Sequence, residues 1–345
     1  MDFRPDDSQQ SIIGLAAEVL DGGDGDPDKS WAALGQAGLL TLAVPERLGG
    51  AGLGVLETAL VLTEIGRRAI AVPALHHLAL GVLPVARWGT GRQQDDLLTG
   101  RTLAAAIAEP GDPLPAAPRT TLATDGTVTG VKTGVAAADR LLVTVGGPAV
   151  VIVDPAAPGV TLDRGILRME RAPAEPLAGE DCHAGLHRFA LAGACALGDG
   201  ALAGALALTA GHVRTRQQFG RPLATFQAVA QQIADVYVAS RTLHLAATSA
   251  AWRLGAGRPA DDDLDVAAQW FTAEAPPAAR TCHHLHGGLG LSIDYPLHRH
   301  TALIRDLVRF LGGGEHRLTV LGERVAARRP ESGAGIDGGA ACSST

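Results

Sequence analysis

The chain has 345 residues, of which 46% are hydrophobic, 19% are charged and 3% are aromatic, and its formal net charge is −7. At about 100–200 residues per domain, this length predicts two or three domains, and the composition excludes a disordered chain. The negative charge disfavours a general nucleic-acid binder, because neutralising phosphates requires a basic face. We therefore expect a folded protein that binds no nucleic acid.

Three further features bear on compartment and membrane. The four cysteines include no CxxC pair, which argues against a disulfide scaffold. No basic stretch followed by an apolar run comes after Met1, so we expect no signal peptide. The most apolar run, 189–211, consists mainly of Ala and Gly with Asp199 near its middle, and it predicts a buried helix rather than a membrane span. We therefore expect a cytoplasmic protein that does not enter a membrane.

Residues 1–102 predict an N-terminal helical domain, because apolar residues recur there at helical spacing. One helical pattern spans 56–71 and ends before a proline. Upstream of it, aspartates alternate at 24, 26 and 28 as in a calcium loop, but Lys29 and Gly35 stand where an EF-hand requires Gly and Glu. We therefore predict a linker there, with Ser30 capping the next helix.

In residues 103–180 the sequence pattern changes from that of helices to that of β-strands. β-branched runs at 127–131, 141–145 and 150–153 are separated by Gly, Pro and Asp. No helix-length segment lies between them, which favours hairpins in a small antiparallel β-barrel or sandwich over the alternating β–α units of a Rossmann domain.

Residues 181–328 return to long helical patterns with short joints, which predict a four-helix bundle. The four runs are 188–218, 226–254, 261–285 and 313–327. Residues 329–345 are rich in Gly, Ala and Ser and predict a disordered tail. The predicted fold is mainly α with a small β domain, in the order helical domain, β-barrel, helical bundle.

A first candidate site follows the first long helix of this bundle. We predict that Arg216, Gln218 and Phe219 end that helix at a glycine. A guanidinium there can hold a pyrophosphate with two donors, and the ring offers an apolar or stacking surface. The alternative is a helix-end Arg that pairs with a carboxylate.

A second candidate site, at 282–290, has three histidines and a cysteine within five residues. We expect no metal there, because glycines follow at once and no second Cys/His cluster is evident. The glycine run follows no predicted strand, so it is not a dinucleotide fingerprint. A helix end whose glycines let a bulky ligand approach the backbone fits better.

Together these segments resemble the acyl-CoA dehydrogenase family over about residues 9–328. The shared motifs are Arg216-x-x-Phe219-Gly220 with Phe226-Gln227, His284-x-His286-Gly287-Gly288-x-Gly290 with Asp294-Tyr295-Pro296-Leu297, Trp31-x-x-Leu34, Val44-Pro45-Glu46 and Gly49-Gly50. The resemblance implies FAD, CoA thioesters, dimers or dimers of dimers, and the introduction of a Cα–Cβ double bond into an acyl chain.

The resemblance further implies that one half of the FAD site is intact. In this family the flavin spans two subunits, so these residues would bind the adenosine side of an FAD whose ring lies in the neighbouring subunit. The pyrophosphate and adenosine are assigned to Arg216, Gln218 and Phe219, the adenine to Leu223 and Phe226, and the remaining contacts to His284, Gly287 and Gly288. His284 stands where the family usually has Gln.

The half that faces the flavin ring departs from the family. The usual Thr-Glu-Pro-x-x-Gly-Ser-Asp stretch is replaced by 108–113, which begins Ala108-Glu109-Pro110. Thr133-Gly134 stands where a Trp-Ile-Thr stretch is usual, and no Trp occurs between 88 and 252. The indole that normally covers the flavin ring is therefore missing.

The catalytic base is also missing. Removing a proton next to a thioester carbonyl requires a carboxylate. The usual family position falls at Leu311 or Gly312, and the alternative position falls at or near Ala190. Glu315 is a candidate base, but it follows the usual family position by about one helical turn. The alternative interpretation is that Glu315 is a solvated glutamate at the start of a helix. We therefore predict no catalytic residue in this chain.

These departures resemble the degenerate subunits of heteromeric acyl-CoA dehydrogenases, including those of steroid side-chain breakdown. Such a subunit lends its FAD clamp to a catalytic paralogue in an α2β2 heterotetramer that acts on an acyl-CoA and passes electrons to an electron-transfer flavoprotein. Two alternatives remain open: a homomeric enzyme that uses Glu315 or another base, and a non-enzymatic scaffold that binds CoA or flavin.

Overall fold

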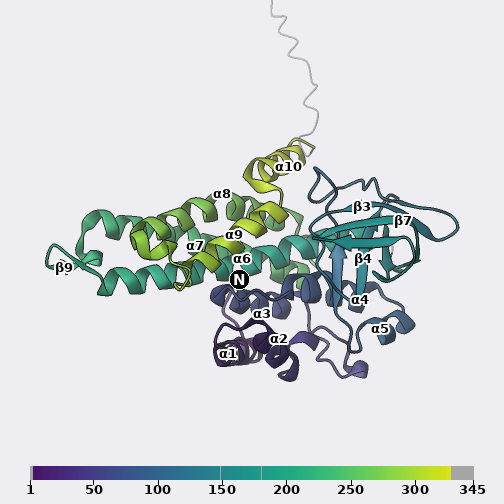
Figure 1. Ribbon diagram of the computed structural model, residues 1–345, viewed down its shortest axis with the longest axis horizontal. Coiled ribbons are helices and arrows are strands. Elements are labelled where there is room, and N and C mark those ends of the chain that lie inside the picture. The colour runs from purple at the N-terminus through teal and green to yellow at the C-terminus, as the bar shows by residue number, and fades with distance from the viewer. Residues whose placement is uncertain (1–2, 148, 180, 328–345) are drawn as a thin grey trace, which may run out of the picture.

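The computed structural model describes residues 3–147, 149–179 and 181–327 and consists of a helical layer, a small sheet and a bundle of long helices (Figure 1). This arrangement confirms the predicted fold class. The predicted tail, 329–345, lies outside the described residues. The principal elements before the bundle are α1 (Asp7–Gly22), α2 (Pro27–Gln36), α3 (Val55–Arg68), the π-helix η3 (Leu75–Val82), α4 (Leu83–Trp88), α5 (Gly91–Leu97), β1 (Leu103–Ala106), β2 (Thr121–Leu122), β3 (Thr127–Lys132), β4 (Arg140–Val145), β5 (Ala149–Val153), β6 (Val160–Asp163) and β7 (Ile166–Pro176).

The start of α2 corrects one prediction from the sequence. Asp26 caps this helix, because its side chain accepts hydrogen bonds from the backbone of Asp28 and Lys29, and Pro27 occupies the first position. Ser30 lies inside the helix and is buried. The prediction that Ser30 is the cap is therefore wrong, since the acidic run itself supplies the cap.

The sheet has strand order β1-β4-β5-β7-β3-β2, with β6 paired to β7. All pairs are antiparallel except β1–β4, which is parallel, so the prediction of a wholly antiparallel barrel is wrong at this edge. Side chains alternate along β4 and β5. Leu142, Val150 and Ile152 join the helical core, whereas Leu141 and Val143 join the core of the β domain. Because of this alternation, one face of the sheet packs against the helices and the other face packs inside the β domain.

The bundle consists of α6 (Cys182–Thr215), α7 (Gln227–Gly255), α8 (Asp261–His286), α9 (Leu297–Phe310) and α10 (Gly313–Ala327). The sequence prediction omitted α9, which lies along α6 and α8 and buries Leu297, Ile304 and Leu307. By length and composition α6 could cross a membrane, but 78% of its most apolar window is buried inside the protein. It is the central helix of the bundle, as the Ala and Gly content predicted.

Candidate functional site

The segment after α6 forms a β-hairpin. α6 ends at Thr215, Arg216 is its C-cap, and β8 (Gln217–Gln218) pairs with β9 (Arg221–Pro222). Phe219 and Gly220 form the turn with φ of 54° and 76°, the positive values that tight hairpins require. The prediction that Gln218 and Phe219 end the helix is therefore wrong.

The hairpin presents an unpaired cation beside aromatic rings. Within the described ranges the side chain of Arg216 is exposed and forms no hydrogen bond or ion pair, so the alternative of a paired helix-end arginine gains no support. The Phe219 side chain is 91% exposed, and its ring centroid lies 6.2 Å from that of Phe226. The guanidinium of Arg221 lies 4.1 Å from the Phe226 ring, and Leu223 follows in the short helix η4 (Leu223–Thr225). Apolar and cationic groups thus share one open surface.

The glycines after α8 lie at the same end of the bundle. The rings of His212 and His286 stack with centroids 4.5 Å apart, which joins the ends of α6 and α8. His284 is exposed in the last turn of α8, and Gly287 and Gly288 begin η5 (Gly287–Leu291). The structure therefore brings the hairpin residues and these glycines to one end of the bundle.

Two of the three histidines of this segment, His283 and His286, form hydrogen bonds within the protein. The Nε2 atom of His286 lies 3.0 Å from the hydroxyl oxygen of Tyr295, and Nε2 of His283 lies 2.7 Å from Oγ1 of Thr301. Burial lowers the pKa of His286. Among the residues that the structure covers, no group of three His, Cys, Asp or Glu side chains is placed to hold a metal ion.

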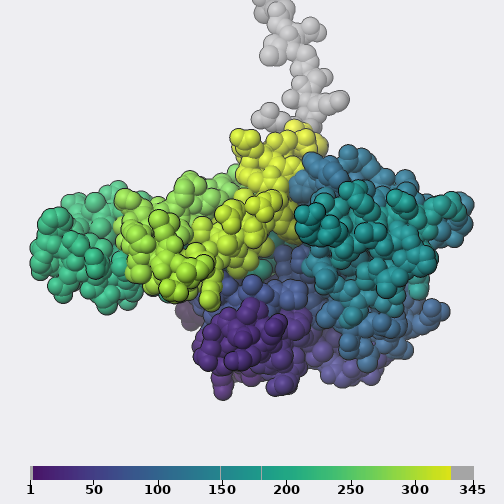
Figure 2. Space-filling model, viewed as in Figure 1, coloured from purple at the N-terminus to yellow at the C-terminus, as the bar shows by residue number. Residues whose placement is uncertain are grey.

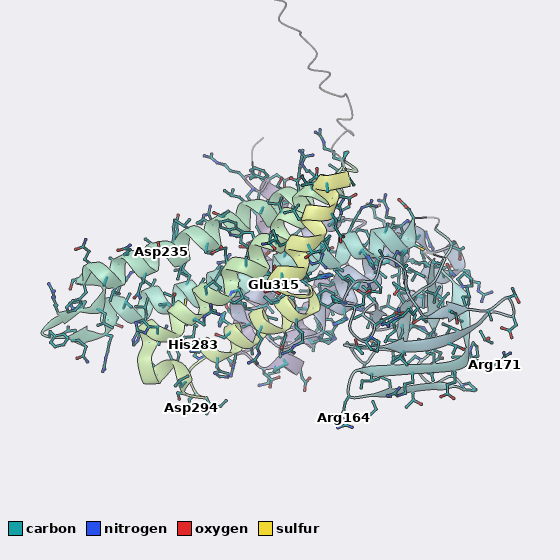
Figure 3. All side chains as sticks on the ribbon, turned by 90° about the horizontal axis from the view of Figure 1, so that it is seen from above. Arg164, Arg171, Asp235, His283, Asp294 and Glu315 are labelled. Atoms are coloured by element: carbon teal, nitrogen blue, oxygen red, sulfur yellow. The ribbon has the colours of Figure 1, made fainter. Side chains whose placement is uncertain are left out.

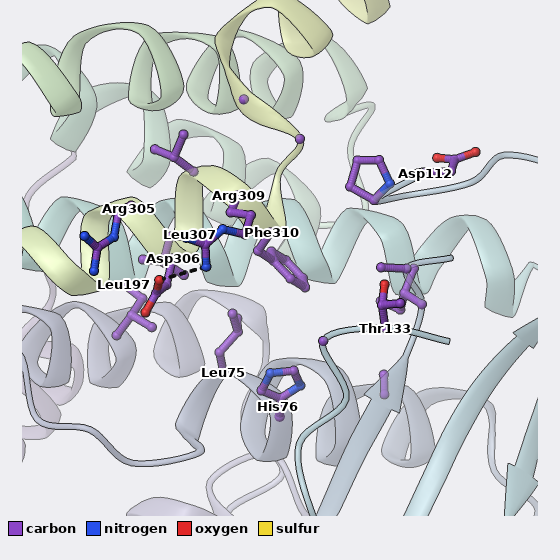
Figure 4. A pocket seen from close by; sticks show the side chains of 18 of the residues that line it. Leu75, His76, Asp112, Thr133, Leu197, Arg305, Asp306, Leu307, Arg309 and Phe310 are labelled. Atoms are coloured by element: carbon purple, nitrogen blue, oxygen red, sulfur yellow. Dashed lines mark hydrogen bonds and ion pairs between the residues drawn. The ribbon is translucent and has the colours of Figure 1, made fainter. Parts of the chain in front are cut away.

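A pocket of about 880 Å³ lies beside the β domain, between η3, the loop after β1 and the end of α9 (Figure 4). Its apolar lining comprises Val72, Leu75, Ala105, Ile107, Ala108, Pro113, Leu197, Leu303, Leu307, Val308 and Phe310. Its polar side chains are His76, Glu109, Asp112, Thr133, Arg305, Asp306 and Arg309. The size and the apolar lining suit a small-molecule ligand.

The buried carboxylate of this pocket is poorly suited to accept a proton. Burial by itself would raise the pKa of Glu109, but hydrogen bonds from the backbone of Arg119 and from Lys132 and Thr120 outweigh it and hold the pKa well below its usual range. The Nζ atom of Lys132 donates to Glu109 at 2.9 Å, and Thr120 donates through both its backbone N–H and its hydroxyl. A carboxylate bonded in this way is a weak base.

The other acidic groups in or near the pocket are not buried in the described structure. Asp306 is exposed and pairs with Arg309 at 3.2 Å (Figure 4). Glu315 is exposed in the first turn of α10 and does not line the pocket (Figure 3). Asp112 lies at the pocket edge on the loop after β1.

The expected positions of the base offer no carboxylate and little space. Leu311 and Ala190 are buried. Gly312 has φ of 89°, and a Cβ there would lie 2.5 Å from the His316 ring and 2.7 Å from Pro113. Any side chain at Gly312 would therefore require the pocket rim to move.

Two residues of this region were not predicted from the sequence. Lys132 is fully buried, and its Nζ also donates to Thr144 Oγ1 at 2.9 Å. His76 lines the pocket with a buried and unpartnered Nδ1. The rarity of lysine in this chain was a possible signal for Lys132, whereas nothing in the sequence separates His76 from its neighbour His77.

Comparisons with known proteins agree with this architecture. The acyl-CoA dehydrogenase N-terminal domain matches residues 9–102, and the acyl-CoA dehydrogenase C-terminal domain matches residues 185–326. Acyl-CoA dehydrogenase FadE28 of Mycobacterium tuberculosis is 44% identical, with 94% of this chain and 99% of that protein covered.

Solved structures give the same result. The ChsE4-ChsE5 complex from Mycobacterium tuberculosis matches with a TM-score of 0.87 and 31% identity, over 96% of this chain and 100% of that one. The Tcur3481-Tcur3483 steroid ACAD G363A variant matches with a TM-score of 0.86 and 30% identity, over 93% of this chain and 98% of that one. PigA with FAD and proline shares the fold at a TM-score of 0.82 and 21% identity, over 95% of this chain and 100% of that one. This chain belongs to the acyl-CoA dehydrogenase family.

Proposed function

We propose that this chain is the non-catalytic partner subunit of an FAD-dependent acyl-CoA dehydrogenase and acts with a catalytic paralogue. The observation that carries the proposal is the contrast between its two sites. The pocket has no free buried carboxylate among the described residues, whereas the hairpin surface has an unpaired arginine and exposed apolar rings. Two similar structures are of two-protein assemblies, the ChsE4-ChsE5 complex and the Tcur3481-Tcur3483 steroid ACAD, and they support a heteromeric partner.

The shape of the chain supports a shared cofactor. α6 has 34 residues and is about 50 Å long at 1.5 Å per residue. It begins beside the β domain, passes the pocket at Leu197 and ends at the hairpin, which projects at the opposite end of the molecule from the β domain (Figures 1 and 2). A dinucleotide cannot reach from one site to the other, so the hairpin surface serves a flavin whose ring is bound in another subunit.

The hairpin surface suits the adenosine half of FAD. Arg216 offers two parallel donors to a pyrophosphate, and Phe219, Leu223 and Phe226 offer apolar surface to an adenine. His284, Gly287 and Gly288 extend this surface, with glycine backbone that a ligand can approach closely. We call these eight residues the clamp: Arg216, Gln218, Phe219, Leu223, Phe226, His284, Gly287 and Gly288. Bound FAD would supply the hydride acceptor for α,β-desaturation of an acyl-CoA.

The finer parts of the proposal follow from the family resemblance. They are an α2β2 assembly in the cytoplasm, a steroid or branched acyl-CoA as substrate, and an electron-transfer flavoprotein as electron acceptor. The similar Tcur3481-Tcur3483 structure supports a steroid substrate, because that protein is described as a steroid ACAD.

The test is to purify the full chain alone and together with a paralogue that has an intact base and is encoded beside it. We expect the lone chain to be nearly colourless and inactive, and the co-purified complex to carry FAD and to turn over acyl-CoA. Bright yellow, active protein from the lone chain would instead support the homomeric enzyme. A complex that binds flavin or CoA without any dehydrogenation would support the scaffold.

A further inference from the structure

We propose that α10 is a hinged lid, which opens away from the bundle as one unit about the glycines that precede it and displaces one rim of the pocket beside the β domain. The proposal does not depend on the catalytic role of this chain, since it applies equally to a partner subunit, a homomeric enzyme and a scaffold. α10 lies at the outer edge of the bundle, at the top of Figure 1, and packs mainly against α8. Its backbone, its packing and its ion pairs each support a lid.

The backbone at the start of α10 suits a hinge. Gly312 and Gly313 have φ of 89° and 85°, and Gly314 follows. Three consecutive glycines carry no side chain that restricts rotation, so the chain can pivot there. Gly312 also lines the pocket, and Pro113 and the His316 ring fill the space that a Cβ would need at Gly312. A rotation at these glycines therefore moves the pocket rim together with α10.

The packing of α10 is almost free of apolar contacts. None of its 15 residues, all of which the structure describes, belongs to a hydrophobic core or is a partly buried apolar residue packed against one. The one buried side chain of this helix is that of Arg317, whereas Leu318 and Val325 are exposed. Segments with few buried apolar contacts open locally while the rest of a protein stays folded. We therefore expect α10 to open before the other helices of the bundle.

Charged groups hold the closed position instead. Arg324 forms ion pairs with Asp265 at 2.6 Å and with Asp261 at 3.5 Å, both in the first two turns of α8. Nε of Arg317 donates to the carbonyl oxygen of Leu311 at 2.6 Å. Burial raises the pKa of Asp265 and lowers that of Arg317, so both groups are desolvated while α10 is closed. Such groups stabilise the closed position only while they are paired, because an unpaired buried charge is more stable in water.

The test is hydrogen–deuterium exchange of the full chain at pH 7, measured by mass spectrometry. An isolated helix of 15 residues is marginally stable in water, so the amides of α10 should exchange whenever it leaves the bundle. We expect Arg324→Gln to increase the opening constant of α10 at least about tenfold, because Asp265 is then buried without its partner. The matched control is Arg101→Gln, which removes a 2.8 Å ion pair from an arginine of similar exposure, 34% against 32%, and should leave α10 unchanged.

A second variant tests the hinge. Gly313→Ala introduces a Cβ with nothing within 4 Å, so its effect is confined to the left-handed backbone of the closed position. We expect the opening constant of α10 to increase about 5- to 30-fold, the cost of that conformation for alanine. Gly257→Ala, between α7 and α8, is the control, because its φ is 65° and its surroundings are equally open. It should not change exchange in α10.

Tryptic cleavage after Arg317 is an independent measurement, because its buried side chain is accessible to a protease only when α10 is open. Cleavage there should be faster in Arg324→Gln and Gly313→Ala than in the wild type and in both controls. The amide of Gly312, which donates to the carbonyl oxygen of Arg309 at 3.0 Å, reports on the rim and should exchange together with α10.

Three results would overturn the proposal. They are equal exchange rates of α10 and α8 in the wild type, unchanged exchange and cleavage in both variants, and opening of α10 without exchange at Gly312. Because each readout is a property of the chain alone, the result is independent of FAD content and of the paralogue.

Discussion

Arg216 is the residue on which the proposed clamp depends most. Its guanidinium is exposed at the end of α6 without a partner in the described structure. We predict that Arg216→Ala weakens FAD binding by the complex with the paralogue roughly 10- to 150-fold, because a charge-assisted contact contributes about 1.5–3 kcal/mol. The measurement is a flavin titration of apo complex. Arg214→Ala, another exposed arginine two residues earlier, is the control and should change affinity less than threefold.

Reduced stability of Arg216→Ala with unchanged flavin affinity would contradict this prediction. That result would make Arg216 a structural residue and would remove it from the clamp.

Glu315 distinguishes the two enzyme hypotheses. It lies exposed in the first turn of α10 and outside the pocket lining. A base must come within about 3 Å of the proton that it removes. We predict that Glu315→Gln in the complex changes the turnover number only a few-fold, whereas loss of a general base reduces it about 100- to 10,000-fold. A loss of a hundredfold or more, with FAD content and assembly intact, would identify Glu315 as the base and this chain as catalytic.

The family motifs predict the clamp residues from sequence alone, but they do not predict the local structure of these residues. A helical pattern through Gln218 continues without a break into the hairpin, and the positive φ of Phe219 is a conformation that apolar patterning does not encode. The unpaired state of His76 depends on what surrounds it in three dimensions, so no sequence rule could predict it.

At the scale of elements, the sequence predicted the long helices of the bundle, but it predicted neither α9 nor the pairing of the first strand. Leu297 was assigned only to a family motif and no helix was predicted after it, although Leu297, Ile304 and Leu307 recur at helical spacing. The parallel β1–β4 pair could not be predicted, since strand period gives the buried face of a strand and not its neighbour.

The contact between α3 and α6 is set by a small residue. A Cβ at Gly200 would lie 1.9 Å from the carbonyl oxygen of Thr63 and 2.7 Å from the backbone nitrogen of Arg67. We predict that Gly200→Ala lowers the free energy of unfolding by about 1–3 kcal/mol, because the helices must separate. Gly211→Ala, in the same helix with open space around it, should raise it by about 0.5–1 kcal/mol. Urea denaturation of both variants is the measurement, and equal midpoints would contradict the prediction.

The Lys132–Glu109 pair joins β3 to the loop after β1 and makes the β domain sensitive to acid. The hydrogen bonds to Glu109 hold its folded-state pKa below the ordinary value of 4.5, so its contribution to stability is full above about pH 4.5 and is lost as the pH falls toward the folded-state pKa. We predict that Glu109→Gln is less stable than the wild type at pH 7 and loses less stability between pH 5 and pH 3. Urea midpoints across this range test it, and parallel pH slopes for the two proteins would show that Glu109 is not the titrating group.

At the scale of the whole molecule, apolar side chains gather at the clamp end. Phe219 is 91% exposed, Leu291 81% and Ile293 77%, on the hairpin and on the segment after α8. Large apolar side chains that are this exposed, on two segments at the same end of the bundle, are typical of an interaction site. The subunit proposal assigns this surface to the paralogue, whose flavin the clamp would contact.

The last prediction tests that assignment without using flavin. Removing an apolar side chain from an interface should weaken association by about 1.5–3 kcal/mol for each buried residue. We predict that Leu291→Ser with Ile293→Ser weakens association with the paralogue at least a hundredfold by sedimentation, while the melting temperature of the lone chain stays within a few degrees. The matched control is Leu318→Ser with Val325→Ser, which alters two apolar side chains of α10 that are 58% and 55% exposed. Since α10 lies away from the hairpin (Figure 1), this control should associate like the wild type. Equal affinities for both double variants would show that the paralogue binds elsewhere, and the two-subunit clamp would then have no surface on which to form.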